Sequence, residues 1–193
     1  MSKKVKRIIF GIGGCIVIFV LIMTWYYPFS PFSVYKSYSY LPYEISFNGE
    51  SYEEILSEFR VSYEKDLKAD VENEYPNLTI HRTEAVLSIF EQEWLRSKDA
   101  VSMDAMKLDT MLFEVKQVRD VLLSLLVQVE YTSEERGYLV DIISNLLAIE
   151  DSIMELQNEK YASRIELNRR FDNLYGAFLT NFRFYATFYE RSH

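Results

Sequence analysis

The sequence predicts an all-α protein in which a single transmembrane helix is followed by an up-and-down bundle of four or five helices. An uncharged apolar run, residues 8–27, follows a basic N-terminus. Beyond residue 51, apolar residues recur at steps of three and four, as they do on one face of an α-helix. Glycine and proline are scarce in that part, which favours long uninterrupted helices.

The apolar run has the length and the flanks of a membrane span. About 20 residues at a rise of 1.5 Å each cross the roughly 30 Å of a bilayer's hydrocarbon core. Four basic residues lie within residues 1–7, and the next one is Lys36, so the positive-inside rule predicts a cytoplasmic tail and an exterior C-terminal part. The expected membrane-interface anchors are Arg7, Trp25, Tyr26 and Tyr27.

Two other fates of this segment are open. A cleaved signal peptide has a shorter apolar region and a small-residue cleavage site, whereas this run ends in bulky aromatic residues. Small residues before Cys15 resemble a bacterial lipoprotein signal, but residues 16–23 stay apolar, which a lipid anchor does not need. We therefore favour a retained helix. Gly11 and Cys15 are spaced as in helix pairs that pack closely, so a homo-oligomer also stays open.

Residues 28–50 form a membrane-proximal linker of distinct composition. The segment holds three prolines and seven aromatic residues, which is too much apolar surface for a solvated flexible chain. We expect it to lie along the lipid headgroups or to pack on the helical domain. A short strand is expected at residues 43–47.

The exterior domain, residues 51–193, is expected to begin with a capped helix. Ser51 starts a capping-box sequence, and Pro76 stops the helix that follows. Thr79 or Thr83 is expected to cap a second helix. A third helix is expected to follow from about residue 102.

The last part of the chain has the clearest periodicity. Thr132 and Ser133 are expected to cap a fourth helix with acidic residues in its first turn, where the helix dipole favours them. The coiled-coil-like alternation of three and four then continues to Phe188, except at Lys160 and Ser163. Residues 133–189 are therefore either one helix or two helices separated by a turn near residues 157–160. We favour the turn, because a single helix would reach about 85 Å and outrun its partners.

Charge and cysteine content limit the function. All 29 acidic residues and 17 of the 21 lysines and arginines lie after residue 27, so this part has a formal net charge of −12. A nucleic-acid-binding protein needs a basic face or groove, so nucleic acid is not an expected partner. The only cysteine is Cys15, so the exterior domain has no disulfide, which favours a bacterial cell surface.

The residues needed for enzymatic or metal chemistry are few. The chain has two histidines, His81 and His193, whereas a zinc site needs three or four nitrogen or sulfur ligands. Only His81 is placed to serve as a base for a nucleophile. No glycine-rich phosphate loop occurs in the exterior part. We expect no enzymatic activity, no metal and no cofactor.

Two functions from different classes remain. The leading hypothesis is a membrane-anchored accessory or scaffold subunit that contacts another membrane or surface protein. The alternative is an extracytoplasmic ligand-sensing module that works through a partner membrane protein, since the predicted tail is too short to signal. A pocket with convergent polar groups would favour the sensor, and an exposed aromatic patch would favour the contact protein.

The candidate contact residues lie in the last turns of the C-terminal helix. These turns are either the end of the core stripe, as aromatic residues at helical spacing usually are, or an extension past the bundle that reaches a partner. The second interpretation makes the following residues candidate contacts: Phe182, Phe184, Tyr185, Phe188 and Tyr189.

Overall fold

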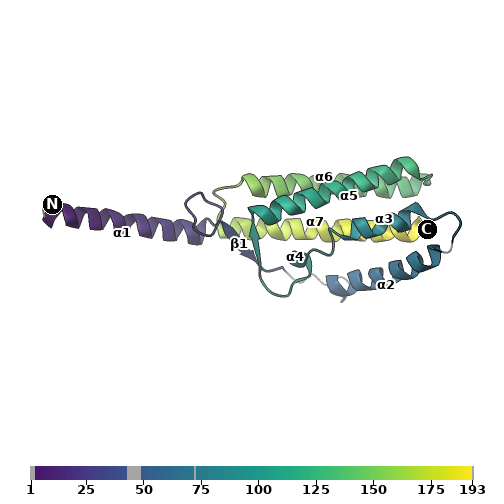
Figure 1. Ribbon diagram of the computed structural model, residues 1–193, viewed down its shortest axis with the longest axis horizontal. Coiled ribbons are helices and arrows are strands. Elements are labelled where there is room, and N and C mark those ends of the chain that lie inside the picture. Colours follow the sequence, from purple (N-terminus) through teal and green to yellow (C-terminus); the bar gives the residue numbers. More distant parts are fainter. Residues whose placement is uncertain (1–2, 43–48, 72, 193) are drawn as a thin grey trace.

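The structure, a computed structural model, describes residues 3–42, 49–71 and 73–192. This part of the chain is mostly helical, with one apolar helix at its N-terminal end (Figure 1). The elements in chain order are α1 (Lys3–Tyr26), β1 (Ser37–Tyr40), α2 (Tyr52–Asp70), α3 (Leu78–Leu87), α4 (Glu93–Arg96), β2 (Val101–Asp104), α5 (Ala105–Gln128), α6 (Ser133–Asn158) and α7 (Arg164–Arg191).

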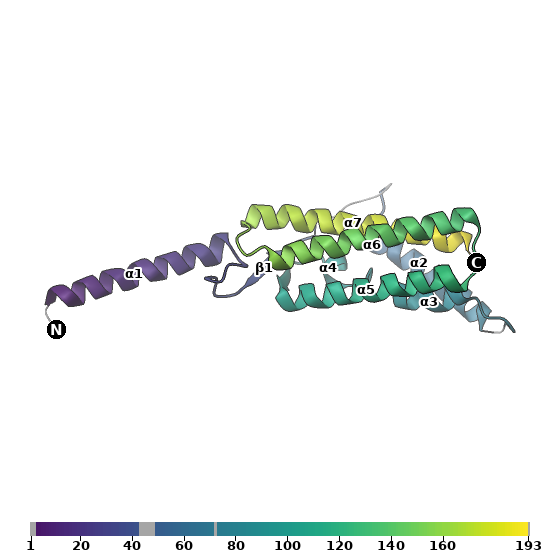
Figure 2. The same cartoon turned by 90° about the horizontal axis from the view of Figure 1, so that it is seen from above.

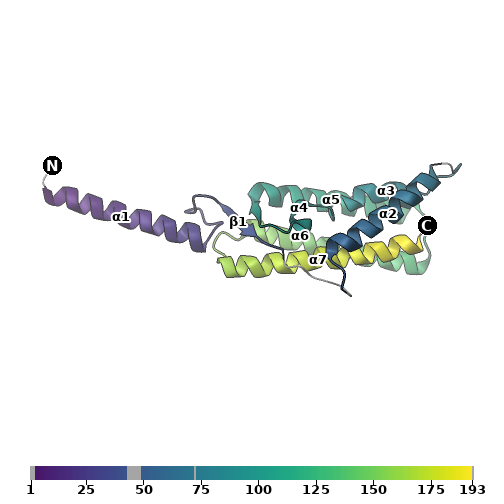
Figure 3. The ribbon, with the colours of Figure 1, turned by 90° about the horizontal axis from the view of Figure 1, so that it is seen from below.

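The apolar run forms a single helix, α1, which projects from one end of the other elements (Figures 1 and 3). It is long and apolar enough to cross a membrane, by length and composition. None of its residues is buried, whereas the apolar helix of a soluble core would be covered by other elements. The helix ends at Tyr26, two residues before Pro28, which cannot continue it.

Helices α5, α6 and α7 lie side by side and alternate in direction (Figures 1 and 2). A turn separates α6 from α7, so the two-helix interpretation of residues 133–189 is confirmed. Thr132 and Glu135 form a capping box at the start of α6. Ser163, one of the polar interruptions of the apolar pattern, is the N-cap of α7, and its side chain accepts a hydrogen bond from the amide of Glu166.

The helices after the linker differ in detail from the prediction. The capping box at Ser51 is confirmed, and α2 ends at Asp70, before Pro76. Asn77 caps α3, because its side-chain oxygen accepts hydrogen bonds from two amides of the first turn. Thr79 and Thr83, the expected caps, are buried within α3 instead, where their hydroxyls hydrogen-bond tyrosines.

A two-stranded antiparallel sheet is the main departure from an all-α fold. Tyr38 of β1 lies opposite Met103 of β2, and Tyr40 lies opposite Val101. The two tyrosines are buried while the serine between them is exposed, which is the period-two pattern of a strand. The helix expected from about residue 102 is α5, which begins at Ala105, after β2. The strand expected at residues 43–47 lies outside the described residues.

The core is built around the aromatic face of α7. Near the start of α7, the Phe171 ring stacks on Tyr38 of β1 at a centroid distance of 5.6 Å. Further along, Phe182 meets the rings of Phe59 and Phe90 at 5.5 and 5.2 Å. Strand β1 belongs to the linker, so the linker packs on the helical domain through its tyrosines.

Candidate functional site

Arg164, the first residue of α7, joins α1 to the rest of the chain. Its guanidinium carbon lies 4.9 Å from the centroid of the Trp25 ring, and its Nε donates a hydrogen bond to the Trp25 carbonyl oxygen. A cation–π contact contributes about 0.5–2 kcal/mol, depending on how far it is shielded from water. The C-terminal end of α1 is thus held against the end of the domain at which α7 begins.

The loop of residues 27–36 turns back along α1. The Phe32 ring meets the Phe19 ring edge-on at 5.4 Å, and the Val34 amide donates to Thr24 Oγ1 at 3.1 Å. Phe19 lies seven residues before the end of α1 at Tyr26, which is about 10 Å along the helix axis. The loop therefore lies beside the last two turns of α1.

The backbone of this loop is hydrogen-bonded largely within itself. Ser30 and Ser33 donate their amides to the carbonyls of Tyr27 and Ser30, at 3.0 and 2.9 Å. The serine hydroxyl oxygens accept from the amides of Phe32 and Lys36, at 3.2 and 3.4 Å. Both serines are buried. The loop also contains two prolines, which have no amide hydrogen to satisfy.

Apolar side chains are exposed around this end of the domain. We call this set the collar; it comprises Phe32, Val34 and Tyr35 of the loop, Tyr161 of the α6–α7 turn and Ile165 of α7. The exposed fractions of the collar residues run from 51% for Phe32 to 84% for Ile165. Beside the loop, a groove of about 270 Å³ has apolar walls that include Phe29 and Leu156, together with Lys36 and Lys160.

The expected membrane-interface anchors lie at both ends of α1. Trp25 and Tyr26 are more than half exposed, and Tyr27 is partly buried. Arg7 lies in the first turns of α1 and is exposed. Trp25 contacts the domain through Arg164.

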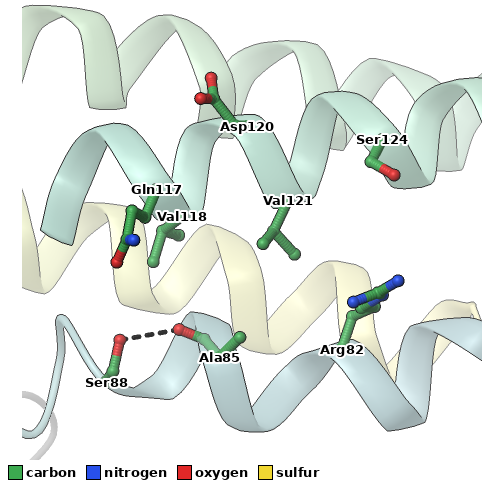
Figure 4. A pocket seen from close by; sticks show the side chains of 8 residues that line it. All are labelled: Arg82, Ala85, Ser88, Gln117, Val118, Asp120, Val121 and Ser124. Atoms are coloured by element: carbon green, nitrogen blue, oxygen red, sulfur yellow. Dashed lines mark hydrogen bonds between the residues drawn. The ribbon is translucent and has the colours of Figure 1, made fainter.

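A shallow groove of about 590 Å³ lies between α3 and α5 (Figure 4). Val118 and Val121 lie toward α3, and polar side chains surround them. Ser88 donates its hydroxyl hydrogen to the Ala85 carbonyl, and Asp120 points away from both residues. The polar groups therefore do not converge on one point, and nothing here resembles a catalytic arrangement.

A third groove, of about 380 Å³, lies between α4 and α5 and is lined by both apolar and polar groups. Trp94 donates its indole hydrogen to the side-chain oxygen of Gln92 at 2.6 Å, and Gln92 donates in turn to Glu114 at 2.5 Å. Met106 and Met111 form part of the apolar wall. This groove combines a flexible apolar wall with an ordered row of polar groups.

The candidate contact residues at the C-terminus lie in the core. Phe182, Tyr185, Phe188 and Tyr189 are at most 1% exposed, and Phe184 is partly buried against the core. Of the two interpretations of these turns, the burial fits the end of the core stripe, because other elements pack over them. Phe59 of α2 meets Tyr189 at 5.1 Å, and Tyr131 meets Phe188 at 5.3 Å. Burial raises the pKa of the Tyr185 hydroxyl, which hydrogen-bonds Thr83.

Three of the buried polar side chains that the sequence analysis did not single out are Glu150, Asp70 and Asn181. Glu150 of α6 accepts two hydrogen bonds from Arg119 of α5, at 2.6 and 2.7 Å. The Asp70 carboxylate accepts from the Asn73 side chain and the Asn77 amide, and these bonds lower its pKa. Asn181 of α7 is fully buried, and neither its oxygen nor its nitrogen has a hydrogen-bond partner in the described part of the chain. In the sequence, Asn181 could have been noticed as a polar residue among the apolar residues of the C-terminal helix.

His81 has a structural partner. Its Nε2 lies 3.1 Å from the Asp70 carboxylate, which also accepts a hydrogen bond from the Asn73 side chain. His193 lies outside the described residues. Within the ranges that the structure describes, no group of three or more His, Cys, Asp or Glu side chains is placed to hold a metal ion.

Comparisons of the chain with models of protein families, with curated proteins and with solved structures found no match.

Proposed function

We propose that this chain is a single-pass membrane protein whose helical domain lies outside the cytoplasm and acts by contact with another membrane protein. The observation that carries the proposal is α1, an apolar helix of 24 residues none of which is buried. In water such a helix would leave a continuous apolar surface uncovered, whereas a bilayer covers it. The basic residues at its start orient the N-terminus toward the cytoplasm.

The contacts at the end of α1 support a retained anchor. A cleaved signal peptide leaves the mature protein and makes no lasting contacts with it. Here Arg164 holds Trp25, and Phe32 packs on Phe19, so the helix is built into the domain. In this proposal the domain is an up-and-down bundle whose long members are α5, α6 and α7. Its orientation relative to the membrane is set by these contacts, as suits an accessory or scaffold subunit.

The outer faces of α5 and α6 replace the terminal aromatic residues as the proposed contact surface. We call these residues the α5–α6 surface: Phe113, Leu123 and Val127 of α5, with Val140 and Leu147 of α6. Between 41% and 86% of each side chain is exposed. On each helix the residues lie within one narrow face, since 3.6 residues make a turn. Large apolar side chains gathered on a helix face are typical of a surface that another protein covers.

Photo-crosslinking in the native membrane tests this function. A benzophenone side chain is placed at Phe113 or Leu147 of the full-length chain, and at the exposed Glu58 of α2 as a matched control. We expect one defined membrane protein to be captured from the first two positions and not from the control. Capture of the same chain alone would indicate a homo-oligomer instead of an accessory subunit. Equal capture from all three positions would refute the α5–α6 surface.

A second function, extracytoplasmic ligand sensing through a partner membrane protein, is favoured by the groove between α4 and α5. Its volume of about 380 Å³ lies within the usual range for small-molecule sites, about 300–1,000 Å³. The row from Trp94 through Gln92 to Glu114 supplies hydrogen-bonded polar groups along the wall of the groove. In a Trp25→Phe background, a ligand bound there would change the fluorescence of Trp94, and Glu114→Gln would weaken its binding. Absence of any such ligand from medium and membrane extracts would count against a sensor.

A further inference from the structure

We propose that the loop of residues 27–36 is a second membrane-contact element, which inserts into the outer leaflet beside α1. The inference rests on the proposed function, since it requires α1 to span the bilayer. It adds an occupant for the collar, namely the phospholipid of the same membrane. Three independent features of the loop lead to it: its depth, its backbone and its charge.

The first feature is depth. The aromatic residues that end α1 place Tyr26 at the level of the lipid headgroups. Phe19 then lies about 10 Å deeper, within the hydrocarbon, and Phe32 reaches the same depth because the two rings touch at 5.4 Å. Val34 is fixed at the level of Thr24 by its amide hydrogen bond. The exposed halves of Phe32 and Val34 therefore face lipid rather than water.

The second feature is the backbone. Non-helical chain enters a bilayer only where its amides and carbonyls have partners other than water. In this loop the amides of Ser30, Phe32, Ser33, Val34 and Lys36 are all hydrogen-bonded within the loop or to α1. Phe32, Val34 and Tyr35 are exposed, whereas Ser30 and Ser33 are buried and accept hydrogen bonds from the backbone, which inverts the usual arrangement of a loop in water.

The third feature is charge. The part of the chain after residue 27 is strongly acidic, but Lys36 and Lys160 both line the groove beside the loop. The neighbouring acids Glu159 and Glu166 lie 3.1 and 3.6 Å from Arg170, so their charges are partly compensated, whereas no acid is paired with Lys36 or Lys160 in the described part of the chain. Two cations beside apolar walls fit the phosphate and the upper acyl chain of a phospholipid, with a preference for anionic headgroups.

Depth-dependent fluorescence quenching tests the insertion. The full-length chain, with Cys15→Ser, is reconstituted in vesicles of phosphatidylcholine and phosphatidylglycerol. Single cysteines for an environment-sensitive label replace Phe32 or Tyr35 in the loop. Tyr35 lies outside the Phe19–Phe32 ring contact and is 78% exposed, so its variant keeps that packing intact. Ile18→Cys in α1 reports the span, and Tyr75→Cys after α2 reports water.

We expect the Phe32, Tyr35 and Ile18 labels to be quenched by spin-labelled lipid, and the Tyr75 label by an aqueous quencher only. Lys36→Gln with Lys160→Gln should reduce the quenching of the Tyr35 label in phosphatidylglycerol vesicles to its level in phosphatidylcholine alone. If both loop labels behave like Tyr75 while Ile18 is quenched by lipid, the insertion is overturned and the anchor stands. That result would leave a partner protein as the occupant of the collar. If the Ile18 label is also quenched by the aqueous quencher only, both the proposed function and this inference are refuted.

Discussion

Replacing Asn181 by leucine should stabilise the protein. The Asn181 side chain is fully buried in α7, and both of its polar atoms lack hydrogen-bond partners in the described part of the chain. Leaving a buried polar group unsatisfied costs about 1–3 kcal/mol. Leucine has a similar volume and no polar atom, so it removes this cost and adds apolar contact. Small steric adjustments offset part of the gain.

We therefore expect Asn181→Leu to raise the free energy of unfolding by about 1–3 kcal/mol. For a chain of this size, a gain of 2 kcal/mol corresponds to a Tm about 4–8 °C higher. The assay is urea unfolding of the full-length protein in detergent, followed by circular dichroism at the helix band. An unchanged denaturant slope would show that the unfolded state is not affected.

Asn181→Ala is the matched control, because it removes the amide but leaves a small cavity whose cost offsets the gain. We expect its free energy of unfolding to stay within about 1 kcal/mol of the parent. A loss of stability in both variants would refute the reasoning. It would mean that the amide is satisfied in the folded protein, for example by a buried water.

Three further predictions concern other contacts. Arg119→Met should lower the free energy of unfolding by about 3–5 kcal/mol, because it leaves the Glu150 charge buried and unpaired. Adding Glu150→Leu to the same chain should recover most of this loss, as measured by urea unfolding. The pKa of Asp70 is lowered by hydrogen bonds, so its contribution to stability is present above the unfolded pKa of about 3.9 and is lost as pH falls through the lower folded value. Asp70→Asn should therefore lower Tm at neutral pH and reduce its slope below about pH 4, whereas an unchanged slope would contradict this assignment. Arg164→Gln should free the end of α1, which faster amide hydrogen exchange near Trp25 would reveal; unchanged exchange there would show that Arg164 does not hold the helix.

The predictable part of the fold rests on short-range signals. A cap needs a side chain that reaches an amide two or three residues away, and so Ser51 and Thr132 were sufficient to place two helix starts. The apolar run before Pro28 likewise predicted α1. The steps of three and four marked the buried face of α7 before its neighbours were known. Ser163 shows the limit of such signals, since its N-cap role was visible only once the turn before α7 was in place.

The candidate sites depended on long-range packing. Phe182 and Tyr189 fit both a core stripe and an exposed surface on the sequence pattern, and only the position of α2 over the end of α7 decided for the core. The pairing of β1 with β2 joins segments separated by about sixty residues, and no local propensity encodes such a partner.

The sequence by itself determined where helices begin, which faces are apolar and that the first helix suits a membrane, because these properties depend on neighbours within a few residues. The tertiary structure alone decided which apolar side chains are covered and which stay open. It folded the loop back onto Phe19, and it left the Asn181 side chain without a hydrogen-bond partner among the described residues. Coverage is a property of segments that meet in space, so the collar and the α5–α6 surface appear only after the chain has packed.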